Sequence, residues 1–399
     1  MSTFSLKKNI IETIIVKGGI LLLNFAIMVF VARRWNAEGK GIVTLFAANL
    51  GIIAMFNNIF TSSSVSYYLK KTGLSKLTTQ AYIWVAVVSG IVASLISLWN
   101  GWNDLSLLLY IISVVFGFVV FHSFLFIGSQ KIPYYNLIVL LQPLLLFVFM
   151  LLSYYVFDDR FSYYSYFYAQ LISLVLIFVL ATVITRKTLG RSKFELDRET
   201  IRQTFNFGWK TELSNLLQFL NYRFSMYVLF YLAGIQSVGV FSIGVSVAEA
   251  IWIFSKSISV VQYSNVLQTG DTVSSRKETA KVSYISLLAS SVCIAIVSLL
   301  PANLFVWIFG SEFQPVKSVI LLMSPGILAI AISNVYGNFL SATGKLNILI
   351  IKSAAGLFVT LILSFLLISK WGITGACIVN SCTYMVSSIL LIMYFFRKK

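Results

Sequence analysis

The chain has 399 residues, of which 58% are hydrophobic and only 11% are charged, and its formal net charge at pH 7 is +17. Its mean hydropathy of +0.89 lies far above that of soluble globular domains, which excludes that class. A basic balance of this size is typical of nucleic-acid binding, but in so apolar a chain its meaning depends on where the charges lie.

Apolar runs long enough to cross a bilayer, which takes about 20 helical residues, recur along the whole chain. Because a backbone in lipid must satisfy its own hydrogen bonds, continuous apolar runs of this length predict helices. We predict twelve spans, at about residues 10–31, 42–60, 82–98, 105–128, 136–157, 163–184, 207–232, 239–262, 282–300, 319–342, 348–368 and 373–396. The predicted fold class is an all-α integral membrane protein.

Lys and Arg are distributed unevenly between the predicted loops. With the N-terminus placed in the cytoplasm, the inner segments carry nineteen of them and the outer segments six. Cytoplasmic loops carry such an excess in membrane proteins, so both termini are predicted to be cytoplasmic. The net charge therefore indicates topology and attraction to a membrane surface, and no nucleic-acid partner is expected.

The chain contains an internal repeat. The segment GKGIVTLFAANL at residues 39–50 is echoed by QSVGVFSIGVSV at 236–247, with Gly41 aligned on Gly239, 198 residues further on. We predict an N-terminal six-helix lobe over residues 1–187, a cytoplasmic linker over 188–204 and a C-terminal six-helix lobe over 205–399. Duplicated halves of this kind are typical of alternating-access transporters, which hold their substrate between the repeats.

Residue patterns for catalysis or metal binding are missing from the sequence. The only histidine, His122, has no Cys or carboxylate at metal-ligand spacing, and Cys293, Cys377 and Cys382 all fall inside predicted spans. No phosphate-binding glycine loop or nucleophile elbow is present either. We therefore expect no enzyme activity, no metal and no cofactor.

Charged side chains inside the spans are the main functional candidates, because they are costly in lipid. Arg223 and Glu249 lie thirteen residues before and after Gln236, in the turn between the seventh and eighth spans. Two antiparallel helices therefore place them at similar depth. They form either a structural ion pair or an anion-binding arginine with a carboxylate that gates it or takes a proton.

Two spans also carry polar stripes. Asn215, Gln218 and Tyr222 share one face of the seventh span, and Lys17 and Asn24 share one face of the first. Such stripes are expected to face other helices or a cavity, and a basic cavity suits an anionic head group. The candidate substrate-binding residues are Arg223, Lys17, Asn24, Asn215, Gln218, Asn221 and Lys352, and the candidates for counter-charge or ion coupling are Glu249 and His122.

Several segments resemble one known family. ARRWNAEGKGIVTLF (residues 32–46) is similar to the first-loop signature of the polysaccharide-transport flippases, in the multidrug/oligosaccharidyl-lipid/polysaccharide (MOP) exporter superfamily. FNFGWKTELSNLLQFLNYRFSMYVL (205–229) and VGVFSIGVSVAEAIW (238–252) resemble the seventh and eighth spans of that family. Residues 309–345 and 372–386 resemble its C-terminal half.

The resemblance implies a MATE-like fold, with about twelve helices in two pseudo-symmetric six-helix lobes around a central cavity. It also implies a flippase of the bacterial inner membrane that moves undecaprenyl-pyrophosphate-linked oligosaccharide units by alternating access, for O-antigen, capsule or exopolysaccharide synthesis. The implied partners are the polyprenyl-pyrophosphate-linked oligosaccharide, membrane lipids and other polysaccharide-assembly proteins. Some members couple transport to a proton or sodium gradient.

The chain departs from the family pattern at one position. The seventh-span motif often reads Arg-x-Asp, whereas Ser225 stands here in place of Asp, which makes Glu249 the expected counter-charge of Arg223. Two alternatives remain open. A multidrug exporter of the same superfamily is expected to carry acidic groups in its cavity, and a membrane glycan polymerase is expected to carry a large outer loop.

Overall fold

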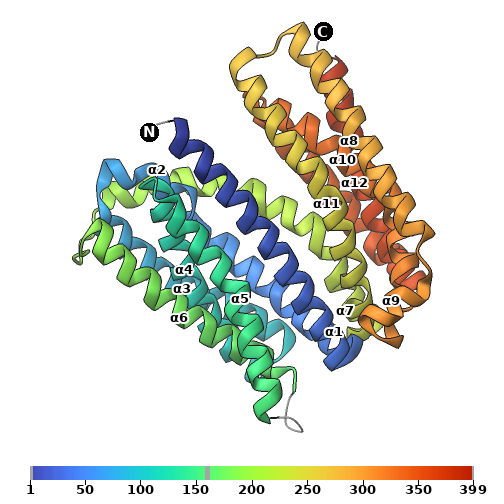
Figure 1. Ribbon diagram of the computed structural model, residues 1–399, viewed down its shortest axis with the longest axis horizontal. Coiled ribbons are helices and arrows are strands. Elements are labelled where there is room, and N and C mark those ends of the chain that lie inside the picture. The colour runs from blue at the N-terminus through green and yellow to red at the C-terminus, as the bar shows by residue number, and fades with distance from the viewer. Residues whose placement is uncertain (1–2, 158–161, 398–399) are drawn as a thin grey trace. The chain divides into compact units, whose positions relative to one another are not determined.

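The computed structural model describes residues 3–157 and 162–397, and all the regular elements in these ranges are helices (Figure 1). The first part holds α1 (Thr3–Thr61), α2 (Ser63–Thr72), α3 (Leu74–Asn100), α4 (Asp104–Gly128), α5 (Ile132–Phe157) and α6 (Tyr164–Leu189). The second holds α7 (Arg198–Thr269), α8 (Val273–Leu299), α9 (Ala302–Phe309), α10 (Val316–Ala342), α11 (Leu346–Leu363) and α12 (Ser369–Arg397). The predicted all-α fold class is confirmed.

Three helical stretches are long enough to hold two spans each: α1 with α2, α7, and α11 with α12. The backbone breaks inside each of them. The breaks lie at Asn36 (φ 55°) in α1, at Gly234 (φ 82°) in α7 and at Gly372 (φ 51°) in α12. Within the described residues, nine stretches are long and apolar enough to cross a membrane, and the three longest have 58, 55 and 51 residues. The nine therefore accommodate the twelve predicted spans.

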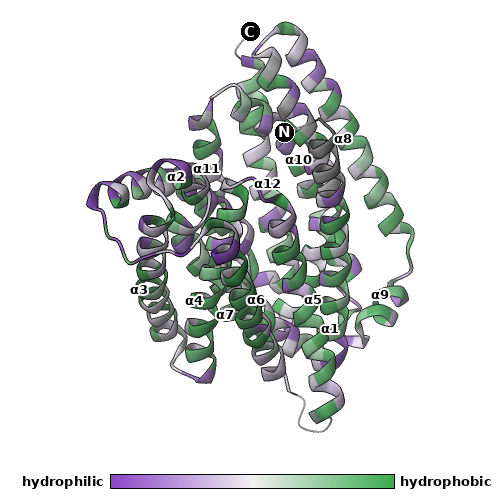
Figure 2. Cartoon of the chain, turned by 60° about the vertical axis from the view of Figure 1, so that its left-hand side comes forward, coloured by the Kyte–Doolittle hydropathy of each residue, from purple (hydrophilic) through white to green (hydrophobic). Residues whose placement is uncertain are grey.

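The surfaces of the helices are those of a multi-pass membrane protein. Hydrophobic residues run along the middle of the helices, whereas hydrophilic residues gather at their ends and in the turns (Figure 2). Large apolar side chains such as Leu22 (74% exposed) and Phe358 (64% exposed) point outward, which is favourable only in lipid.

The chain divides into two compact units. Unit 1 comprises the residues up to Val31 together with Phe46–Asn215, and unit 2 comprises Ala32–Leu45 together with the residues from Leu216 onward. Two contacts hold the segment 32–45 in unit 2: Arg33 Nε donates to the Ile308 carbonyl oxygen (2.9 Å), and Ala37 N donates to Glu312 Oε2 (2.8 Å).

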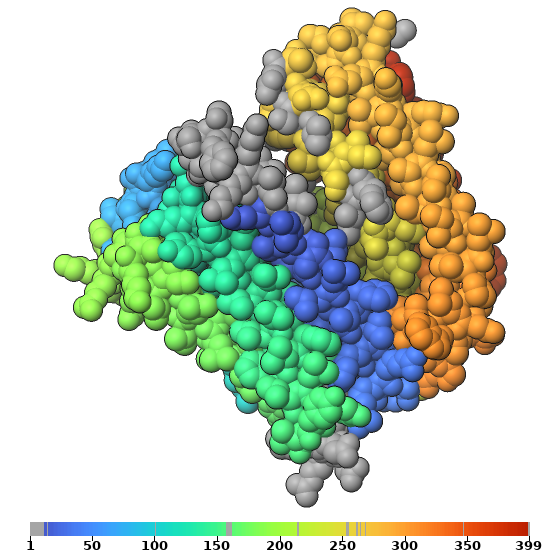
Figure 3. Space-filling view, in the orientation of Figure 1, coloured from blue at the N-terminus to red at the C-terminus, as the bar shows by residue number. Residues whose placement is uncertain are grey.

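Each unit has one central helix. In unit 1, α4 packs against α2, α3, α5 and α6. In unit 2, α10 lies beside α8 and α12 (Figure 1), and α8 forms an outer surface of the unit, drawn in orange in Figure 3. Small residues allow the close approach of α10 and α12: a Cβ on Gly326 would lie 2.7 Å from Ser381 Cα, and Ser381 Oγ donates to the Leu322 carbonyl oxygen (3.0 Å).

The two copies of the repeat pack against each other inside unit 2. A Cβ on Gly41 would lie 2.2 Å from the Ile235 carbonyl oxygen, and a Cβ on Gly239 would lie 1.9 Å from the Ala37 carbonyl oxygen. The same offset of 198 residues that aligns Gly41 with Gly239 also aligns Ala37 with Ile235. The contact is therefore reciprocal, as in a two-fold interface, and only glycine fits on either side.

A hydrogen bond at the same contact follows the repeat. Thr44 Oγ1 donates to Ser242 Oγ at 3.1 Å, and these two residues are also 198 positions apart. The sequence repeat is thus a real structural equivalence, and it places residues 37–44 beside residues 235–242 within unit 2.

Candidate functional site

The charged residues of unit 2 include an ion pair within the membrane-spanning part of α7. Arg223 Nη2 lies 3.0 Å from Glu249 Oε1, and the two side chains are 28% and 32% exposed. The break at Gly234 lies between them and allows the chain to fold back, which brings the two residues to the same level. The structure thus joins the two residues that the depth argument placed together.

Lys40 adds a second cation to this pair. It lies in the segment 32–45, which belongs to unit 2, and interacts electrostatically with both Arg223 and Glu249. Its Nζ donates to Thr44 Oγ1 at 3.0 Å. Two cations facing one carboxylate leave the cluster with a net positive charge.

Lys40 falls in the outer loop between the first two predicted spans and is not among the predicted site residues. A signal was nevertheless present, because Lys40 aligns with Val238 in the second copy of the repeat. A lysine in place of an apolar residue of a repeated apolar motif is a functional candidate, because burying its charge in the membrane costs free energy.

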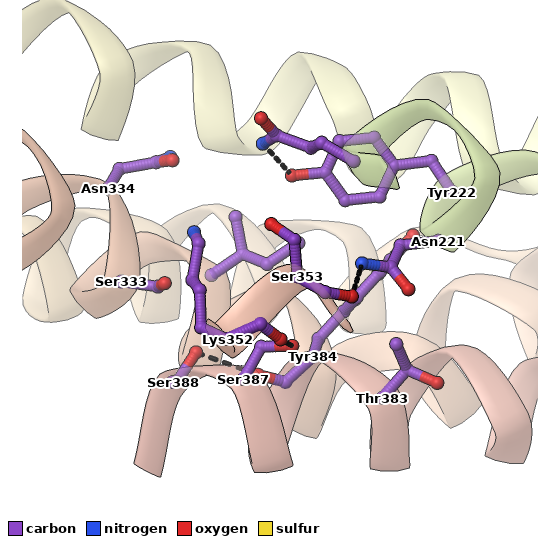
Figure 4. A pocket seen from close by; sticks show the side chains of 12 residues that line it. Asn221, Tyr222, Ser333, Asn334, Lys352, Ser353, Thr383, Tyr384, Ser387 and Ser388 are labelled. Carbon is purple, nitrogen blue, oxygen red and sulfur yellow. Dashed lines mark hydrogen bonds between the residues drawn. The ribbon is translucent and has the colours of Figure 1, made fainter. Parts of the chain in front are cut away.

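A polar pocket of about 20 Å³ lies between α7, α10, α11 and α12 (Figure 4). The volume is about that of one water molecule. Lys352 is the one charged residue in the lining, and no carboxylate lines it in the described part of the chain. The lining residues are Gln218, Asn221, Tyr222, Ile330, Ser333, Asn334, Lys352, Ser353, Thr383, Tyr384, Ser387 and Ser388.

Some polar atoms of the lining bond to one another and some do not. Gln218 Nε2 donates to Tyr222 Oη, and Asn221 Nδ2 donates to the Ser353 carbonyl oxygen, both at 2.8 Å (Figure 4). Asn221 Oδ1 and Tyr384 Oη are buried and find no hydrogen-bond partner among the described residues. A buried polar atom without a partner costs about 1–3 kcal/mol, so these two oxygens are suited to a bound water or ligand group.

Aromatic rings connect the pocket to the ion pair. Tyr222, Trp252 and Tyr384 form a triangle with ring centroids 5.5–5.8 Å apart. Both tyrosines also interact electrostatically with Arg223 and Glu249. The pocket and the charge cluster are therefore parts of one polar region inside unit 2.

Ser225 occupies the position where the resemblance expects an aspartate. It is fully buried and donates to Asn380 Oδ1 at 2.8 Å, which is a neutral contact between α7 and α12. No carboxylate is present at this position, and Arg223 pairs with Glu249 instead.

Four of the predicted site residues, Lys17, Asn24, His122 and Asn215, belong to unit 1, whereas Arg223 belongs to unit 2. Lys17 and Asn24 are exposed on the first part of α1. Asn215 is exposed and donates to Glu212 Oε2 at 3.3 Å. Glu212, which is not among the predicted site residues, is buried and accepts a hydrogen bond from Ser62 Oγ at 3.0 Å.

His122 also lies in unit 1, buried between α3 and α6. Its Nε2 is 2.8 Å from Tyr82 Oη, and its Nδ1 is 2.8 Å from Thr185 Oγ1. Both ring nitrogens thus have neutral partners, and the described residues show no ion pair at His122. Within the same ranges, no group of three His, Cys, Asp or Glu is placed to hold a metal ion.

Comparison with protein families gives one match that covers most of the chain. The model of a family described as "Polysaccharide biosynthesis protein" matches residues 6–263. The chain belongs to this polysaccharide biosynthesis family. Among curated proteins, this family member is 30% identical over 190 residues to the capsular polysaccharide biosynthesis protein CapF of Staphylococcus aureus, covering 47% of each chain.

A second curated relative, an uncharacterized membrane protein of Methanocaldococcus jannaschii, is 22% identical over 283 residues, which is 69% of this chain and 56% of the relative. The chain thus spans about half the length of the curated relatives that it matches. Among solved structures, an inward-facing multidrug resistance MATE family transporter of the MOP superfamily superposes with a TM-score of 0.72 at 13% identity, covering 95% and 94% of the two chains.

The lipid II flippase MurJ in an inward closed conformation superposes with a TM-score of 0.77 at 14% identity, covering 97% of this chain and 88% of MurJ. At these identities the similarity shows the fold alone. This polysaccharide biosynthesis family member has the MATE-like fold that the family resemblance implied.

Proposed function

We propose that this member of the polysaccharide biosynthesis family is a flippase for lipid-linked oligosaccharides. It would carry undecaprenyl-pyrophosphate-linked repeat units from the cytoplasmic to the outer face of the bacterial inner membrane, with both termini in the cytoplasm. The observation that carries the proposal is the positively charged cluster of Lys40, Arg223 and Glu249 beside a polar pocket, within a membrane-spanning unit. A net positive charge at this depth is costly unless an anion uses it.

The chemistry of the region matches the two polar parts of such a substrate. Arginine and lysine hold phosphate oxygens through charge-assisted hydrogen bonds, which suits Arg223, Lys40 and Lys352 to the pyrophosphate. The free oxygens of Asn221 and Tyr384 are suited to sugar hydroxyls. We place no catalytic step in the region, because translocation needs binding and release only.

The pocket must widen before it binds a sugar. Its volume of about 20 Å³ is far below the roughly 300–1,000 Å³ of ordinary ligand pockets. The described structure therefore corresponds to a closed form of the region, and the proposal requires α7 to move against α11 and α12. Such a change is the alternating access that the fold performs in transporters.

The relatives support this reading by their names. CapF is named for capsular polysaccharide biosynthesis and MurJ is described as a lipid II flippase. A multidrug exporter is less well supported, because an exporter of cationic drugs needs acidic groups, and here the cluster carries two cations to one carboxylate.

Coupling to a proton or sodium gradient is part of the proposal. When the pyrophosphate binds Arg223, Glu249 loses its ion-pair partner and can bind a proton or a sodium ion. Release of the substrate then restores the ion pair, so that the two events alternate on the same residues.

Substitution of the ion pair tests the proposal in cells that make the polysaccharide. Arg223→Ala should reduce the surface polysaccharide at least tenfold, because a hydrogen bond to a charged group contributes about 1.5–3 kcal/mol. Lys256→Ala, on the same helix but outside the pocket lining, is the matched control and should leave the polysaccharide unchanged. Lipid-linked units should accumulate on the cytoplasmic face of the Arg223→Ala strain.

The double variant Arg223→Ala/Glu249→Ala separates a structural pair from a functional one. It removes one positive and one negative charge together, so that the net charge of the cluster, which Lys40 then carries, is unchanged, and the protein should remain at its normal abundance. It should still fail to export the polysaccharide. Full export by the double variant would show that the pair serves the fold alone.

A further inference from the structure

A second pocket of unit 2 is lined by the turn between α7 and α8, the first turns of α8 and the end of α12. Its volume is about 780 Å³, and its residues lie in segments that the charge count assigns to the cytoplasmic side. The lining consists of Asp271, Thr272, Val273, Arg276, Lys277, Ala280, Lys345, Phe395 and Phe396.

Charge in this pocket is predominantly positive and held in place. Asp271 accepts hydrogen bonds from Arg276 Nε (2.6 Å) and Arg276 Nη2 (3.0 Å), and its Oδ2 accepts from Lys345 Nζ. The carboxylate thus fixes cations from α8 and from the turn before α11 around one space. With Lys277, three cations face one carboxylate, which leaves a net charge of about +2.

The cations retain donors for a ligand. Arg276 also gives Nη1 to the Phe395 carbonyl oxygen (2.7 Å), so three of its five N–H groups are used by described partners. Its guanidinium lies 5.2 Å from the centre of the Phe395 ring, which holds it at the wall of the pocket. Lys277 is exposed and forms no ion pair within the described ranges.

The remaining walls are apolar and open to the surroundings. Val273 is 74% exposed and Phe396 is 55% exposed, and both belong to the lining. A small soluble anion gains nothing from such walls, whereas a lipid places its phosphate on the cations and its acyl chains against the apolar side chains. A volume of 780 Å³ is within the range of ordinary ligand pockets.

We propose that this pocket binds the head group of an anionic phospholipid of the cytoplasmic leaflet, such as phosphatidylglycerol. Basic pockets between transmembrane helices on the cytoplasmic side are suited to such head groups. The bound lipid would join the α7–α8 turn, the turn before α11 and the end of α12. The site is separate from the polar region around Arg223 and does not depend on what that region transports.

Lipid binding to the purified full chain tests the proposal. Native mass spectrometry would count phosphatidylglycerol retained in competition with phosphatidylcholine, and we expect the anionic lipid to be retained in preference. Lys277→Gln should weaken retention about fivefold, which corresponds to about 1 kcal/mol for one basic residue near an anionic surface. Because Lys277 has no described ion pair, this variant should fold normally.

Lys281→Gln is the matched control, since Lys281 is exposed on the same helix one turn further on and does not line the pocket. It should retain phosphatidylglycerol as the wild type does. Equal retention by wild type and Lys277→Gln would overturn the proposal, and so would displacement of the lipid by millimolar inorganic phosphate. Displacement by an equal concentration of undecaprenyl phosphate would overturn it by making the pocket a substrate subsite.

Discussion

Replacing Gly239 with alanine tests whether the repeat holds two helices in contact. The new Cβ would lie 1.9 Å from the Ala37 carbonyl oxygen, whereas ordinary van der Waals contact begins at 3.4 Å, so the helices must separate by about 1.5 Å. The obstructing atom belongs to the backbone and cannot rotate away. Overpacking costs about 1–3 kcal/mol, and we expect Gly239→Ala to lie at the upper end of that range.

The reciprocal substitution and a control complete this experiment. Gly41→Ala meets the Ile235 carbonyl oxygen at 2.2 Å and should cost slightly less, whereas Gly18→Ala meets nothing within 4 Å. Because a single separation of the helices relieves both clashes, the double variant Gly41→Ala/Gly239→Ala should lose less stability than the sum of the losses of the two single variants.

The melting temperature of the purified protein in detergent is the measurement. Gly239→Ala and Gly41→Ala should each lower it by several degrees, and Gly18→Ala should leave it unchanged or raise it, because alanine favours helix more than glycine does. If Gly239→Ala had the same melting temperature as the Gly18→Ala control, the close contact between the repeat copies would be refuted.

Three further predictions concern single side chains. Hydrogen bonds from Arg276 lower the pKa of Asp271 from 3.8 to about 2. The ionised carboxylate therefore contributes its full stabilisation above pH 3.8 and loses it as the pH falls towards 2. The melting temperature of the wild type should fall across that pH range for this reason, and this part of the fall should be absent in Asp271→Asn. Asn221→Leu removes the side-chain hydrogen bond from α7 to the Ser353 carbonyl oxygen of α11 and should lower the melting temperature. A leucine variant that melts at the wild-type temperature would show that this bond is not needed. His122→Phe removes the ring nitrogen that bonds the buried Thr185 hydroxyl and should destabilise the protein by about 1–3 kcal/mol, measured by denaturant unfolding. Unchanged stability would contradict a structural role.

The sequence was sufficient for the helices and for the ion pair, for a physical reason. A continuous apolar run of bilayer length satisfies its backbone hydrogen bonds in lipid only as a helix. Two such helices joined by a short turn place Arg223 and Glu249 at similar depth, because the rise per residue is fixed. The glycines of the repeat were visible as Gly41 and Gly239, although their reciprocal contact was not.

The pocket could not be predicted in the same way. Its lining comes from four helices. The contact between Tyr222 and Tyr384 depends on how α7 packs against α12, and the residue spacing within a single helix does not show this packing. Serine and tyrosine are also common in membrane helices and do not stand out there. Lys40 was missed because the segment 32–45 packs in unit 2, although the first half of the sequence contains it.

Translocation by the purified protein is the most direct test of the central claim. Protein reconstituted in vesicles would be supplied with a labelled polyprenyl-pyrophosphate-linked oligosaccharide, and the label reaching the opposite leaflet would be measured over time. We predict transfer by the wild type and by Lys256→Ala, and none by Arg223→Ala/Glu249→Ala. Wild-type vesicles that transfer no more label than protein-free vesicles would contradict the proposed flippase function.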